Sequence, residues 1–159
     1  MTTLLNKNFI LNNPHHIIAL GFGTGLYKKA PGTLGTLVAI PFFLAINKVD
    51  IYLQLLFVVM VFILGIWSSN VTSKSLKLKD PSCIVIDEIA AFLLLLILIN
   101  PNTYQLIYAF ILFRIFDIWK PYPISWLENR YSGGFGIMID DIAAALMALI
   151  IYLITNYAL

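Results

Sequence analysis

Residues 51–67 read IYLQLLFVVMVFILGIW, an apolar run in which Gln54 is the only strongly polar residue. A run of this length, about 17–20 residues, can cross the hydrocarbon core of a bilayer as a helix. The whole chain has the same character, because its 159 residues are 60% hydrophobic and only 11% charged, with a mean hydropathy of +0.90. An average soluble domain carries about 25% charged residues. The composition therefore excludes disorder, argues against an ordinary soluble domain and favours a small membrane protein.

Four further apolar runs share the features of residues 51–67: they are continuous rather than alternating and rich in Leu, Ile and Ala, which favours helices over strands. They are residues 34–46, 84–99, 104–119 and 142–154. A polar stretch, 68–81, follows the run at 51–67, and a glycine-rich link, 132–136, precedes the last run. We therefore predict an all-α fold, a compact helical membrane bundle of about five helices that forms a single domain over residues 1–159.

The charged residues predict an orientation in the membrane. If the runs cross in turn, nine of the ten Lys and Arg residues lie in the N-terminal segment or at one set of helix ends, and only Lys48 lies at the other. Positive charge marks the cytoplasmic side of membrane proteins. Seven of the eight carboxylates, all but Asp50, lie on the same side. We therefore expect a polar site at the cytoplasmic face of the bundle.

Carboxylates at the ends of three apolar runs form the first candidate site: Asp87 and Glu88, Asp117, and Asp140 and Asp141. Oxygen ligands of this kind suit hard cations such as Mg²⁺. Acidic residues in the first turn of a helix also stabilise it, by about 0.3–1 kcal/mol each, so a purely structural role stays open for the two pairs. It does not explain Asp117, which lies near the end of its run. We expect a metal site here.

Two glycine-rich segments, GFGTG at 21–25 and PGTLGT at 31–36, form the second candidate site. The second segment opens a predicted helix, and a helix N-terminus attracts phosphate. The basic residues Lys28, Arg114 and Lys120 would add to that attraction. Neither segment matches a dinucleotide fingerprint or a P-loop. The single cysteine, Cys83, lacks the surroundings of a nucleophile and is predicted to be a packed thiol. The net charge of +2 does not suggest nucleic acid as a partner.

Three blocks of the sequence together resemble the phosphatidylglycerophosphatase A family: GFGTGLYKKAPGTLGT at 21–36, IVIDE at 84–88, and FRIFDIWKPYPI with GGFGIMIDDIAA between 113 and 144. The resemblance covers residues from about 19 to 145, and no acidic position departs from the family pattern. It implies an all-helical, multi-pass enzyme of the bacterial inner membrane. Such an enzyme uses Mg²⁺ to remove the terminal phosphate of phosphatidylglycerophosphate, with its active site facing the cytoplasm.

The resemblance and the residue types together suggest roles for individual side chains. Asp87, Glu88, Asp140 and Asp141 are expected to bind metal, and Asp117 is expected to be a further ligand or the base that orients a water. Arg114 and Lys120 would stabilise charge on the phosphoryl oxygens. Hydrolysis would proceed without a covalent Cys or His intermediate. The remaining candidates for substrate binding are Gly32, Thr33 and Thr36, which would cradle the phosphate, and Lys28.

Two other classes of membrane protein would also use buried carboxylates. A transferase with a CDP-alcohol substrate would be expected to carry a DG-x-x-AR stretch, which is missing here. A cation transporter is the alternative that stays open, although its carboxylates would more naturally lie in mid-helix. The sequence leaves the number of metal ions and the oligomeric state undetermined.

Overall fold

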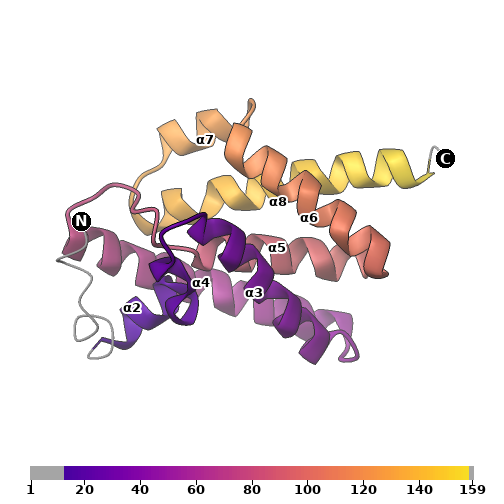
Figure 1. The fold of residues 1–159 in the computed structure, drawn as a ribbon, viewed down its shortest axis with the longest axis horizontal. Coiled ribbons are helices and arrows are strands. Elements are labelled where there is room, and N and C mark those ends of the chain that lie inside the picture. The colour runs from indigo at the N-terminus through magenta and orange to yellow at the C-terminus, as the bar shows by residue number, and fades with distance from the viewer. Residues whose placement is uncertain (1–12, 158–159) are drawn as a thin grey trace.

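The computed structural model of the chain describes residues 13–157, and within that range the fold is all-helical, with no strand (Figure 1). This confirms the all-α part of the predicted fold class. The predicted apolar runs each fall in a different long helix, except that residues 84 and 85 precede the helix that begins at Ile86. The short elements α2, η1 and α7 were not predicted. The elements are α2 (Pro14–Ala19), the 3₁₀ helix η1 (Gly21–Leu26), α3 (Pro31–Ile46), α4 (Ile51–Leu76), α5 (Ile86–Ile99), α6 (Thr103–Trp119), α7 (Ile124–Arg130) and α8 (Gly133–Tyr157).

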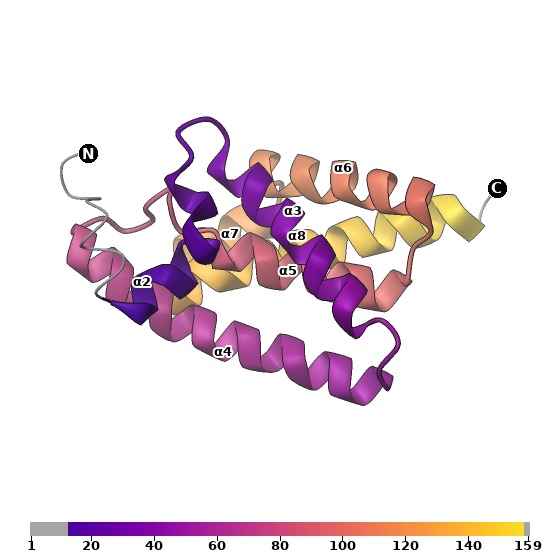
Figure 2. The ribbon, with the colours of Figure 1, turned by 60° about the horizontal axis from the view of Figure 1, so that its bottom comes forward.

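Helix α5 lies at the centre of the fold and packs against α3, α4, α6 and α8 (Figures 1 and 2). Its residues 89–93 are almost fully buried, and so are Leu95 and Leu96. A helix that is apolar on every side is stable only where other helices or lipid surround it. The other long helices therefore hold α5, and its N-terminus, in a fixed position.

Helix α4 continues nine residues beyond the predicted apolar run, to Leu76. The helix therefore includes residues 68–76 of the polar stretch, which the end of the apolar run at residue 67 did not predict. Small hydroxyl side chains line the buried face of this extension and allow α2 to pack closely against it. Thr72 Oγ1, for example, lies 2.8 Å from Nδ1 of the buried His16. Buried hydroxyls with hydrogen-bond partners are compatible with a helix interior, which composition alone did not reveal.

Helix α8 begins at Gly133, so the predicted glycine-rich link was wrong for residues 133–136. Gly134 is needed for close packing, because a Cβ atom there would collide with the backbone carbonyl of Ile66 on α4. The earlier start of α8 also changes the interpretation of Asp140 and Asp141. They lie about two turns inside the helix, whose first turn holds no acidic residue. Stabilisation of the helix dipole therefore does not explain this pair.

Among the residues that the structure describes, two helices are long and apolar enough to cross a membrane by length and composition: α4, and α8 over Gly133–Asn156. Large apolar side chains also point outward from α4 and α6, including Ile63, Ile111 and Ile118. An exposed apolar surface of this extent is typical of contact with lipid. These features indicate a membrane protein. The predicted single domain extends at both ends beyond the described residues.

Candidate active site

A polar cavity of about 240 Å³ lies where the N-termini of α3 and α5, the C-terminus of α6 and the first third of α8 meet. The connection between α4 and α5 closes it with Asp80 and Ser82. All five predicted catalytic carboxylates line this cavity: Asp87, Glu88, Asp117, Asp140 and Asp141. Segments more than a hundred residues apart in the chain thus supply one site. Four of the five carboxylates are buried, and Glu88 is half-buried.

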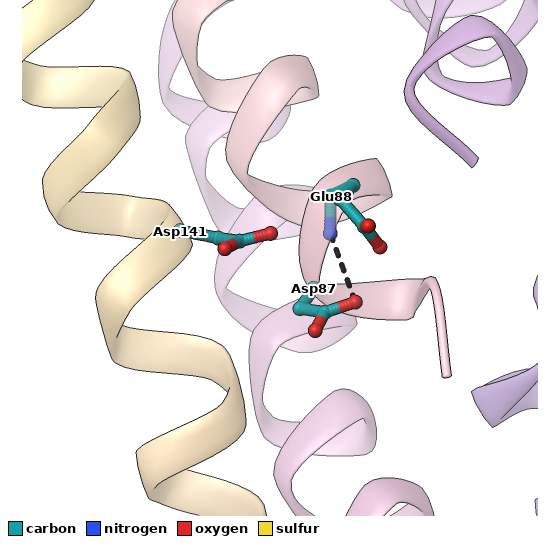
Figure 3. Close-up of side chains that lie close together, drawn as sticks. All are labelled: Asp87, Glu88 and Asp141. Atoms are coloured by element: carbon teal, nitrogen blue, oxygen red, sulfur yellow. Dashed lines mark hydrogen bonds between the residues drawn. The ribbon is translucent and has the colours of Figure 1, made fainter. Parts of the chain in front are cut away.

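Asp87, Glu88 and Asp141 form the carboxylate cluster of this cavity and point toward one another (Figure 3). One oxygen from each lies within 4.8 Å of the others. The backbone N–H of Glu88 donates a hydrogen bond of 3.1 Å to Asp87 Oδ1. Glu88 Oε2 and Asp141 Oδ2 are buried, and no hydrogen-bond partner for them occurs in the described part of the chain. Buried carboxylates without partners are costly unless a cation compensates them. The donor set fits a hard divalent cation.

Asp140 faces a different group from its neighbour Asp141. The Lys120 ammonium donates to Asp140 Oδ2 at 2.5 Å and to Glu128 Oε1 at 3.2 Å. Lys120 ends α6 in the left-handed conformation, with φ of 45°, which turns the chain at the cavity. Burial alone would lower the pKa of Lys120, but its hydrogen bond to Asp140 and the surrounding carboxylates raise that pKa above its usual range. The lysine is therefore a fixed positive charge beside the carboxylate cluster.

Arg114 is the second cation of the cavity, and its Nη1 atom has three neighbours. It donates to Asp117 Oδ2 at 2.5 Å, lies 3.4 Å from Thr36 Oγ1 and lies 3.7 Å from Glu88 Oε1. Arg114 and Asp117 lie three residues apart on α6, which places them on one face of that helix. The Nε atom of Arg114 is buried and has no partner within residues 13–157. The guanidinium therefore retains a donor for a bound anion.

The N-terminus of α3 forms another wall of the cavity, beside Arg114, through Ala30, Pro31 and Gly32. A Cβ atom at position 32 would collide with Glu88 Oε1, so only glycine lets α3 approach the carboxylate cluster this closely. Thr36 is buried, and its hydroxyl donates to the carbonyl of Gly32 at 2.8 Å. Three predicted substrate-binding residues do not line the cavity: Thr36 lies behind Gly32, Thr33 is half-buried, and Lys28 is exposed on the preceding loop.

Asp80 is a cavity residue that was not among the predicted site residues. Burial raises the pKa of its carboxyl. The signal available in the sequence was its place between Lys79 and Pro81 in a polar connection, directly before the IVIDE block. Cys83 is buried as predicted, and burial raises the pKa of its thiol. A buried thiol with little thiolate is a poor nucleophile.

Comparison with known proteins identifies the family of the chain. The family model described as Phosphatidylglycerophosphatase A matches residues 17–156. The chain belongs to the phosphatidylglycerophosphatase A family. This confirms the predicted resemblance and, with it, that the chain is an enzyme of the phosphatase class. All the residues that line the polar cavity lie within the matched range.

Curated relatives match over most of the chain. The Phosphatidylglycerophosphatase A of Escherichia coli is 38% identical over 92% of this chain and 87% of its own length. That of Haemophilus influenzae is 37% identical over 95% of this chain and 94% of its own length. A relative from Bacteroides thetaiotaomicron, 34% identical over 90% of this chain and 94% of its own, is provisionally named a phosphatidylinositol-3-phosphatase. No solved structure matches the chain significantly.

Proposed function

We propose that this member of the phosphatidylglycerophosphatase A family hydrolyses the terminal phosphate monoester of phosphatidylglycerophosphate, giving phosphatidylglycerol and inorganic phosphate with the help of Mg²⁺. One observation carries the proposal: a buried carboxylate cluster lies beside two cations in a cavity at the ends of apolar helices. A lipid phosphate needs such a combination, because its headgroup is anionic and its chains remain in the bilayer. The names of two relatives support the substrate.

Asp87, Glu88 and Asp141 would hold the Mg²⁺ ion. Their carboxylates provide the hard oxygen ligands that this ion prefers, and Glu88 Oε2 and Asp141 Oδ2 are buried without a hydrogen-bond partner among the described residues. Asp140, also proposed as a ligand, keeps one buried oxygen without a partner in the described residues, while Lys120 engages the other. When bound, the ion would neutralise charge on the phosphoryl group and polarise it toward attack.

Residues of the chain itself would bind and orient the phosphate. Arg114 and Lys120 would donate to its oxygens, and Arg can do so with two parallel hydrogen bonds. The free N–H groups of the first turn of α3, at Gly32 and its neighbours, would add donors. Asp117, held by Arg114, would accept a proton from the attacking water. The water oxygen then bonds to phosphorus, the bond to the glycerol oxygen breaks, and that oxygen takes a proton.

We further propose that the chain crosses the bacterial inner membrane several times, with the cavity at the cytoplasmic face. The basic residues near the cavity, including Lys79 and Lys120, support this orientation by the positive-inside rule. The exposed aromatic side chains of Trp119 and Trp126 would lie at the membrane interface on the same side.

The test measures release of inorganic phosphate from phosphatidylglycerophosphate by detergent-purified protein, first with Mg²⁺ and then with EDTA. We expect release that EDTA abolishes and that the Asp141→Asn variant lacks. Phosphatidylinositol 3-phosphate, assayed in parallel, tests the choice of headgroup. Folded protein that releases no phosphate from phosphatidylglycerophosphate would refute the proposal, and cation flux in vesicles would then test the transporter alternative.

A further inference from the structure

An apolar groove of about 440 Å³ runs along the outward face of α6, and we infer that it holds an acyl chain of the lipid substrate. The inference rests on the proposed function, since it requires a substrate with a phosphate at one end and hydrocarbon at the other. The groove is lined by Phe110, Ile111, Arg114, Ile115, Ile118 and Trp119. Apart from Arg114, these side chains offer a ligand mainly hydrocarbon.

The groove and the polar cavity meet at two residues. Arg114 and Ile118 line both of them. The cavity therefore opens sideways onto an apolar surface as well as toward the ends of the helices. A ligand that fills both spaces places anionic groups among Arg114, Lys120 and the carboxylates and lays an apolar portion on α6. A phospholipid has this shape and this distribution of charge.

No residue of α3 lines the groove on α6, so the groove is accessible from the surrounding lipid. Near the cavity the two helices are joined through Arg114, which lies 3.4 Å from Thr36. From this junction they run apart toward the right of Figure 2. Ile111 and Ile115 are 49% and 47% exposed, and Ile118 is 71% exposed. A lipid can therefore reach the groove from the bilayer without passing through water.

The length of the groove fits one leaflet. Residues 110–118 extend about 12 Å along the helix axis at 1.5 Å per residue. Half of a hydrocarbon core about 30 Å thick is about 15 Å. An acyl chain on this face would thus descend through most of the leaflet whose surface carries the cavity. Arg114 lines both spaces, so the end of the chain that joins the headgroup would lie beside it, and its buried Nε has no partner among the described residues.

A second apolar cavity, of about 380 Å³, lies among η1, α3, α4 and α5. It shares no lining residue with the polar cavity. A lipid chain there would have no direct connection with a phosphate bound near Arg114. This difference favours the α6 groove as the binding site of the chain.

The test compares two substrates and two matched variants. The substrates are dioleoyl phosphatidylglycerophosphate in mixed micelles and its water-soluble dibutanoyl analogue. Ile115→Trp fills the groove, and Ile63→Trp places the same side chain at a 59% exposed isoleucine on α4 that lines none of the cavities described above. We expect Ile115→Trp to lower kcat/KM for the dioleoyl substrate about tenfold, which corresponds to about 1.4 kcal/mol. The dibutanoyl substrate should change less than twofold, and Ile63→Trp should change neither.

Each other outcome contradicts the inference in a distinguishable way. If Ile115→Trp and a second variant, Ile111→Trp, both leave the ratio of the two kcat/KM values unchanged, the chain does not lie in this groove, while the proposed function stands. Equal losses on both substrates would show damage to the site rather than to a path for the chain, which also refutes the inference. Wild-type protein inactive on both substrates would refute the proposed function itself.

Discussion

The Gly32→Ala variant would place a methyl group where the structure has the carboxylate of Glu88. The new Cβ atom would overlap Glu88 Oε1 and would lie 3.0 Å from Glu88 Cδ and 3.1 Å from Arg114 Nη1. Because the overlapping atom is the far end of a flexible side chain, Glu88 can rotate away. Its carboxylate must then move by about 1 Å or more, and a displacement of that size can lower a rate about a hundredfold. We expect kcat/KM to fall by about that factor.

The same substitution should change stability little. Overpacking destabilises a core by about 1–3 kcal/mol, but here the side chain that yields is mobile, and alanine is favoured over glycine in a helix by about 1 kcal/mol. Gly134→Ala is the matched control, because its Cβ atom would meet the backbone carbonyl of Ile66, which cannot move aside. We expect that variant to unfold at a lower temperature while its folded fraction keeps the wild-type kcat.

Phosphate release and thermal unfolding, the latter followed by exposure of the buried Cys83 thiol, measure the two effects separately. The reasoning predicts low activity with near-normal stability for Gly32→Ala and the reverse for Gly134→Ala. Full activity in Gly32→Ala would show that Glu88 has no role that depends on its position. A loss of stability equal to that of Gly134→Ala would show that α3, rather than Glu88, gives way.

Three further predictions concern single side chains. Arg114→Lys should lower kcat/KM about a hundredfold because the planar fork of donors is lost, whereas the exposed Arg130→Lys should stay within twofold; equal kinetics would contradict the role of Arg114. Lys120→Met leaves the buried Asp140 without its cation and should destabilise the protein by about 3 kcal/mol in thermal unfolding, and adding Asp140→Asn should restore most of that loss. Because burial raises the pKa of Cys83, a maleimide at pH 8 should label the unfolded protein far faster than the folded one; equal rates would place the thiol at the surface.

The all-α class and the positions of the long apolar helices could be predicted because continuous apolar runs have few alternatives. The ends of α4 and α8 could not. The hydroxyl side chains of residues 68–76 resemble a loop in composition, and only the packing of α2 against them makes a helix there favourable. The glycines at 133–136 likewise resemble a linker, although close contact with α4 requires at least Gly134.

Five of the carboxylates that line the cavity could be predicted as a set, because acidic residues are rare in an apolar chain and therefore stand out. Their grouping could not. The carboxylate cluster includes Asp141 but not Asp140, because successive residues of a helix point in directions about 100° apart, and Asp140 faces Lys120 instead. Asp80 lies in the loop between α4 and α5. Its place in the cavity depends on the path of that loop, which hydrophobic periodicity does not predict.

The site has a consequence for biogenesis, because Gly32 comes from the first long helix and Asp141 from the last. During synthesis the early helices would be inserted while the carboxylate cluster still lacks one of its three members. Catalytic competence would therefore arise only after α8 has docked against α4 and α5. Phosphate release would then report completed assembly, and a partly inserted chain would leave the lipids around it unaltered.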